Sequence, residues 1–269
     1  MDSTTQKGEM SFLDHLEELR GHLFRSLWAV LLCAVAAFIF RTELFEKVLL
    51  APQMPGFLTN RMFCRVGQML HSDSLCINAV PAGIQNIAIA GQFSAAVIVS
   101  LVAGLIVAFP YIVFEAWRFI RPALYENERR NARGAVWVIS ALFLVGVLFG
   151  YYLIAPLSIH FFTHFTSSSQ IQNMPTLQSY LSTVSSVTLG SGLLFELPVL
   201  VIFLTKAGLL TPEFLVKYRR HAIVLLLVLA AAITPPDVFS QVIVVLPLML
   251  LYECSIAWSR RIVRKAGTK

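Results

Sequence analysis

The sequence predicts an all-α polytopic membrane protein with six transmembrane helices and both termini in the cytoplasm. Three observations support this fold class. The 269 residues are 57% hydrophobic and only 13% charged, whereas globular proteins average about 45–50% apolar and about 25% charged residues. The apolar residues are concentrated in six long runs, and Lys and Arg are concentrated in the connections on one side of these runs.

Each run is a candidate transmembrane helix, because about 20 apolar residues are needed to cross the hydrocarbon core of a bilayer. The fifth run has 13 residues, which make about 20 Å of helix against a core of about 30 Å. There we expect the bilayer to thin or a partner to cover the mismatch. The alternating pattern of transmembrane β-strands is absent from the sequence. The six runs are residues 23–40, 93–117, 135–162, 180–204, 221–233 and 238–258.

The positive charges set the expected orientation. Lys and Arg number five in residues 118–133, four in 206–220 and five after Trp258, with none in 165–179 or 234–237. By the positive-inside rule, both tails and the two basic loops face the cytoplasm. This distribution disfavours nucleic acid as a partner, despite the net charge of +6. The chain then forms one transmembrane domain with a cytoplasmic amphipathic segment (1–22), an extracytoplasmic cap (41–88), two cytoplasmic loops (118–133 and 206–220) and a cytoplasmic tail (259–269).

The N-terminal segment combines an apolar face with acidic residues. Four apolar residues recur at helical spacing between Phe12 and Leu23, so the segment is expected to lie on the inner membrane surface before it turns into the first span. Glu17 has Arg20 at i+3, whereas positions 21 and 22 offer Glu18 only a glycine and a histidine. Glu18 is therefore predicted to be an unneutralised carboxylate. The alternative is an ordinary solvated polar face.

The first connection, residues 41–88, is too long for a structureless loop in a compact protein. We expect it to form a cap over the spans, with a helical stretch before Pro52 and with the second helix beginning at Pro81. Cys64 and Cys76 lie in this connection, which is an oxidising location if the membrane is a bacterial plasma membrane. They are candidates for a disulfide.

Prolines interrupt the hydrophobic runs. Pro110 and Pro156 each remove a backbone hydrogen bond, so we expect bends in the second and third helices. Bent long helices favour a curved wall over a straight bundle. Asp237 is placed to cap the sixth helix. Glu253, near the end of that helix, can reach the interface or pair with the arginines at positions 260 and 261.

The fourth run contains one carboxylate, Glu196. The first half of this run is rich in Ser, Thr and Gly, which is typical of close helix packing or a hydrated groove. A carboxylate near mid-membrane costs about 2.5–3.5 kcal/mol on insertion scales. Glu196 is therefore either hydrogen-bonded to its own neighbouring helices or part of a docking or transport site.

The arginine-rich stretch 118–133 contains two acids that are not equivalent. If this stretch is helical, Glu126 has arginines at i+3 and i+4, whereas Glu128 has only Asn131 and Ala132 at these spacings. Side chains meet at these spacings on one helix. Glu128 is therefore predicted to be free to accept a cation from another molecule.

Five separate stretches share one pattern: HLEELR (15–20), AP (51–52), RFIRPALYENERR (118–130), FELP (195–198) and ITPPDVFSQ (233–241). In order and spacing this pattern resembles the TatC family, the receptor subunit of the twin-arginine protein translocase. The resemblance implies six helices in a curved, glove-like arrangement with a concave face. It implies export of folded proteins driven by the proton motive force, in a homo-oligomeric complex with the single-span subunits TatA and TatB. The implied location is the bacterial cytoplasmic membrane.

The resemblance also implies which residues recognise a signal peptide. The carried-over positions are Glu18, Arg20, Phe119, Pro122, Leu124, Tyr125 and Glu128, with Glu196 as the intramembrane acidic position. Pro52, Pro110 and Asp237 are expected to have structural roles. Glu17 and Glu126 depart from the family pattern as additional acids, and they leave open which acid contacts which arginine.

A physical account agrees with this recognition. The planar guanidinium of arginine keeps its charge and fits a carboxylate with two parallel hydrogen bonds. Two adjacent arginines of an extended peptide point in opposite directions, so acids on two separate elements, Glu18 and Glu128, can hold them. Phe119 and Tyr125 can contact the hydrophobic residues that follow.

Two other functional classes are less well supported by the sequence. A proton-coupled secondary transporter could use Glu196, but no duplicated half with a corresponding acid is visible. An intramembrane enzyme needs a nucleophile with a base, or a metal cluster. His160 and His164 have i,i+4 spacing, but the sequence offers no convincing third ligand. The sequence therefore predicts no enzyme, no metal and no cofactor.

Overall fold

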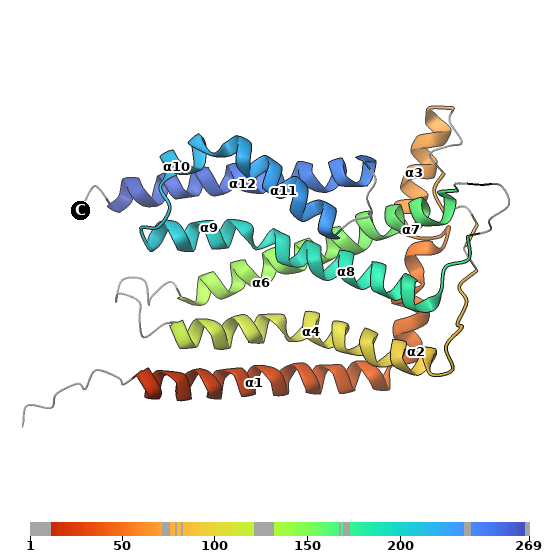
Figure 1. Ribbon diagram of the computed structural model, residues 1–269, viewed down its shortest axis with the longest axis horizontal. Coiled ribbons are helices and arrows are strands. Elements are labelled where there is room, and N and C mark those ends of the chain that lie inside the picture. Colours follow the sequence, from red (N-terminus) through yellow and green to blue (C-terminus); the bar gives the residue numbers. More distant parts are fainter. Residues whose placement is uncertain are drawn as a thin grey trace, which may run out of the picture.

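The computed structural model describes residues 12–71, 76–78, 80–81, 83–120, 132–166, 168, 173–233 and 238–266. The described chain is almost entirely helical, and its long helices lie side by side (Figure 1). In chain order the elements are α1 (Phe12–Ile39), α2 (Arg41–Glu43), the π-helix η1 (Leu44–Leu49), the 3-10 helix η2 (Ala51–Gln53), α3 (Leu58–Met69), α4 (Gly91–Ile120), α6 (Ala132–Phe149), the π-helix η5 (Gly150–Ile154), α7 (Ala155–His164), α8 (Leu177–Phe195), α9 (Leu197–Lys206), α10 (Pro212–Lys217), α11 (Arg219–Ile233) and α12 (Val238–Ala266).

Two ends of the molecule are distinguished below. The end where α1 begins, α4 ends and α12 ends is called the site end, and it lies on the left in Figure 1. The end that carries α2, α3 and α7 is called the cap end, and it lies on the right.

All six hydrophobic runs are helical, and five helical stretches of the described chain are long and apolar enough to cross a membrane. The fifth run forms α11, which has 15 residues and is about 22 Å long at 1.5 Å per residue. The described structure therefore agrees with an all-α membrane protein but shows five full-length candidate spans. These five are Leu16–Ile39, Gly91–Ile120, Gly134–His164, Leu177–Lys206 and Gln241–Arg264.

The expected turn between a surface segment and the first span is wrong. Helix α1 continues from Phe12 to Ile39 without a break, because no proline separates the two parts and the helical periodicity carries on. It lies alongside α4. At Gly104 of α4 a Cβ atom would lie 2.6 Å from the backbone nitrogen of Ala34 in α1. A residue without a side chain therefore lets these two helices approach closely.

Small residues also bring α6 and α8 together, as the composition of the fourth run predicted. A Cβ atom at Gly146 of α6 would lie 2.6 Å from the carbonyl oxygen of Ser191 in α8. The main apolar core continues from this contact to α11 and α12. Its buried residues are Ile154, Val187, Leu194, Phe195, Leu226, Ala230, Val244, Val245 and Leu248.

The third and fourth runs are interrupted near their prolines. The third changes from α-helix to the π-helix η5 at Gly150, and Pro156 stands in the first turn of α7, which follows η5. The fourth breaks at Glu196, between α8 and α9, and Pro198 follows in the first turn of α9. Pro110, in contrast, lies inside an uninterrupted α4.

The cap end is held together by polar contacts and a disulfide. Cys64 of α3 is bonded to Cys76. The side chain of Asn78 donates to the carbonyl oxygen of Pro156 at 3.0 Å, and that of Asn60 donates to the carbonyl oxygen of the fully buried Pro52 at 2.9 Å. These bonds connect the segment around the disulfide to η2 and α7.

The predicted start of the second helix at Pro81 is wrong, because α4 begins at Gly91. Before it, the amide of Gln85 donates to the carbonyl oxygen of Pro175 at 3.1 Å, and the amide of Leu177 donates to the carbonyl oxygen of Gln85 at 2.8 Å. This strand-like pairing with a distant segment uses the backbone groups that a helix would need.

Candidate functional site

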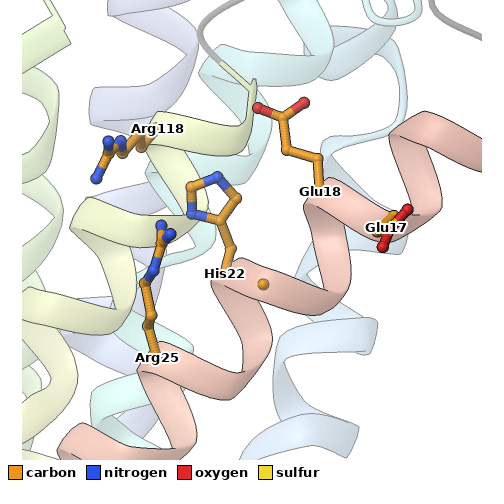
Figure 2. Close-up of a pocket in the computed structure, with 6 residues that line it drawn as sticks. Glu17, Glu18, His22, Arg25 and Arg118 are labelled. Carbon is orange, nitrogen blue, oxygen red and sulfur yellow. The ribbon is translucent and has the colours of Figure 1, made fainter.

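A cavity of about 400 Å³ lies at the site end, between α1 and α4 (Figure 2). Its position follows from helical spacing. Residues 18, 22 and 25 of α1 are four and three residues apart and so share one face, and residues 115 and 118 of α4 do the same. The lining residues are Glu17, Glu18, Gly21, His22 and Arg25 of α1 and Arg118 of α4.

The two acids of the cavity are open to other molecules. Glu18 is half-buried and Glu17 is exposed, and no ion pair joins either of them to a cation in the described part of the chain. The expected pair between Glu17 and Arg20 does not form, since the Arg20 guanidinium instead lies 5.5 Å from the centre of the Phe24 ring. Figure 2 shows the Glu18 side chain extending toward α4.

A third carboxylate, Glu115 of α4, is buried behind the cavity with only 2% of its surface exposed. Its Oε2 atom lies 2.5 Å from Nδ1 of His22 and 3.8 Å from a guanidinium nitrogen of Arg25. The hydroxyl of Tyr111, one turn earlier in α4, is another partner. Burying a carboxylate is costly unless charge and hydrogen bonds compensate it, so these contacts explain how Glu115 is tolerated here.

Sequence reasoning missed Glu115 as well as the cavity residues Arg25 and Arg118. A signal for Glu115 was present, because it is the only charged residue in positions 93–117. A lone acid in an apolar run was recognised at position 196 but not at position 115.

Of the predicted recognition residues, Glu18 lines this cavity and Phe119 contacts a lining residue, His22. Phe119 makes an edge contact with the ring of His22, with 6.1 Å between ring centres. Arg20 lies on α1 but does not line the cavity. The other predicted members, Pro122, Leu124, Tyr125 and Glu128, lie outside the described residues, as does Asp237.

Glu196 lies apart from the cavity, at the junction of α8 and α9. Its Oε1 atom is buried and has no hydrogen-bond partner among the described residues. The Glu196 carboxyl group also has a hydrogen bond with the backbone of Phe143 in α6, so its neighbouring helices satisfy it in part but leave this oxygen without a partner.

The structure also places Glu253 and the two histidines of the third run. Glu253 pairs with Arg219 of α11 at 2.8 Å rather than with the arginines at 260 and 261, because α10–α11 folds back against α12. The rings of His160 and His164 have centres 4.1 Å apart. Among the described residues no group of three or more His, Cys, Asp or Glu side chains is placed to hold a metal ion.

A family model described as "Sec-independent protein translocase protein (TatC)" matches residues 14–247. The chain belongs to the TatC family. The TatC protein of Blattabacterium sp. subsp. Periplaneta americana is 40% identical over 262 residues, which cover 97% of this chain and 98% of that protein. TatCy of Bacillus subtilis is 32% identical over 258 residues, covering 96% and 92% of the two chains.

The fold is shared with solved TatC structures. A crystal structure titled as the twin arginine translocase receptor TatC is 32% identical and matches with a TM-score of 0.69, over 91% of this chain and 98% of that one. The resemblance inferred from the sequence motifs is thereby confirmed. This TatC-family protein is a multi-pass membrane protein of protein transport and a translocase component rather than an enzyme.

Proposed function

We propose that this TatC-family protein is the receptor subunit of a twin-arginine translocase, and that acids at the site end bind the arginine pair of signal peptides. The observation that supports this most directly is the open carboxylate of Glu18 in a cavity between α1 and α4. It is half-buried and has no ion pair in the described chain. Such a group can accept a guanidinium without first losing an internal partner.

The chemistry of the pair explains the selectivity. A guanidinium forms two parallel hydrogen bonds with a carboxylate, whereas a lysine ammonium lacks this planar fork. Glu18 on α1 holds one arginine, and Glu128 in the basic loop holds the other. Phe119 and Tyr125 contact the apolar residues after the motif, and Arg20, Pro122 and Leu124 are the other proposed members of the signal-peptide site.

The orientation completes the proposal. Both termini and the site end face the cytoplasm of a bacterium, where signal peptides are made, and the cap end faces outward. The shared position of the start of α1 and the end of α12 in Figure 1 supports this arrangement, as does the oxidised pair Cys64–Cys76 at the opposite end. Helix α11 is the fifth span and the short one, and α12 is the sixth.

The same proposal assigns a partner site to Glu196. The complex includes the single-span subunits TatA and TatB and further copies of this chain, and the proton motive force drives export. The buried Glu196 oxygen without a partner supports docking of a polar group from another subunit beside the break between α8 and α9. Membership of the TatC family favours this role over that of a proton-coupled transporter.

A parallel binding assay tests the proposal. The purified protein in nanodiscs is titrated with a fluorescent signal peptide that carries either twin arginine or twin lysine. The twin-arginine peptide is expected to bind more tightly than the twin-lysine peptide. The Glu128→Gln substitution is expected to weaken binding of the twin-arginine peptide. Equal affinity for both peptides would refute the receptor role, and a Glu128→Gln protein that binds like the parent would remove Glu128 from the site.

A further inference from the structure

Glu18 has a potential ion-pair partner on its own helix, but in the tertiary structure that partner contacts a different carboxylate. His22 stands at i+4 from Glu18 on α1, the spacing at which an acid and a basic group of one helix pair. In the structure Nδ1 of His22 instead lies 2.5 Å from Glu115 of α4, which is 93 residues away in the sequence. Both His22 and Glu115 are buried, with 7% and 2% of their surfaces exposed.

Arg25 is held in the same way but more loosely. Its side chain is 54% exposed and lines the cavity, and its guanidinium lies 3.8 Å from Glu115. Two carboxylates and two guanidiniums line the cavity, so the formal charges of its acids and arginines balance. Glu115 lies directly behind them and pairs with Arg25, so one of these guanidiniums is already engaged within the protein.

We propose that Glu115 is a positioning residue for arginine recognition. It engages His22 and Arg25, so that neither group neutralises Glu18 and an external guanidinium finds that carboxylate free. This inference rests on the proposed receptor function, but it concerns a residue that touches no part of the peptide. Glu115 acts on the ligand only through the two basic groups of α1.

A purely structural role for Glu115 gives different expectations. If Glu115 only fastened α1 to α4, removal of either partner would weaken the protein, and removal of both would not restore binding. The two helices have an independent close contact at Gly104 and Ala34, about three turns farther along α4. The helix pair therefore does not depend on the Glu115 cluster alone.

The test is a set of variants titrated with the twin-arginine peptide in nanodiscs. Glu115→Gln frees His22 and Arg25 and is expected to weaken binding about fivefold, the upper range for a partly exposed charge pair. Adding His22→Leu to Glu115→Gln removes one competitor and is expected to return the affinity to within about twofold of the parent. Arg25→Gln alone is expected to tighten binding about threefold, because it removes an opposing charge.

A matched control is Glu253→Gln, which removes the acid of another helix-bridging ion pair, at 2.8 Å from Arg219. It is expected to leave peptide affinity unchanged. The inference would be overturned if the Glu115→Gln protein bound the peptide as tightly as the parent. It would also be overturned if the double variant bound the peptide as weakly as Glu115→Gln alone. If the Glu115→Gln protein does not fold, the Arg25→Gln variant tests the inference instead. Unchanged or weaker peptide binding by the Arg25→Gln variant would then overturn the inference.

A measurement without peptide separates this inference from the receptor proposal. Carbodiimide labelling of Glu18, read by mass spectrometry, reports how free that carboxylate is. Labelling is expected to slow in Glu115→Gln and to recover in the double variant with His22→Leu; equal rates would contradict the inference. Failure of the receptor proposal shows separately, as equal affinity of the parent for the arginine and lysine peptides.

Discussion

Replacing Glu18 by glutamine tests the recognition model at the residue that the structure describes best. The substitution keeps the shape of the side chain and removes the charge. A hydrogen bond to a charged group contributes about 1.5–3 kcal/mol. Because Glu18 is half-buried, solvent screening reduces this contribution to about 1–2 kcal/mol. The twin-arginine peptide should therefore bind about 5- to 30-fold more weakly.

The stability of the Glu18→Gln protein should not change measurably, since no ion pair of the described chain is lost with the charge. Binding is measured by fluorescence anisotropy in nanodiscs at about 0.05 M and 0.5 M salt, and the difference from the parent should shrink at high salt. Glu213→Gln, an exposed acid of α10, serves as the control. An affinity for Glu18→Gln within twofold of the parent would show that Glu18 does not hold an arginine.

Three further predictions follow from other parts of the molecule. Replacing Cys64 and Cys76 by serine opens a loop with a sequence separation of 12, which should lower the free energy of unfolding by about 3 kcal/mol in the chain-entropy model; thermal unfolding under non-reducing conditions measures it, and equal melting temperatures would contradict it. Gly146→Leu should destabilise the protein by about 1–3 kcal/mol or more, because its side chain meets the backbone of Ser191; detergent-resistance assays measure this, and a fully stable variant would refute the packing contact. Glu196→Gln should leave peptide binding intact but reduce crosslinking of single-span partners to α8, and undiminished crosslinking would exclude Glu196 as the docking group.

Local patterns predicted the helices well but their boundaries less well. All six apolar runs are helical, and the small residues of the fourth run pack closely against α6. The start of the second helix was misplaced at Pro81 because residue 85 pairs with residues 175–177. The turn expected near Leu23 is absent because α1 packs along α4 as one helix. Both differences arise from contacts with segments distant in the sequence.

At the candidate site, too, local spacing predicted some features correctly and contacts between side chains decided the others. Glu18 was identified from the spacing of charges along one helix, and this reasoning correctly left it unpaired in the described chain. The partner assigned to Glu17 was wrong, since Arg20 lies over the Phe24 ring. Spacing along one helix indicates which side chains can meet. It does not show which of several neighbouring groups forms the contact.

By itself, the sequence determined that this is a helical membrane protein of the TatC family, because composition, hydrophobic run length and short motifs are local properties of a chain. Only the tertiary structure decided which charges are available at the site end. His22 lies one turn from Glu18, yet it pairs with Glu115, because a carboxylate buried between two helices needs a partner more than one that water can solvate.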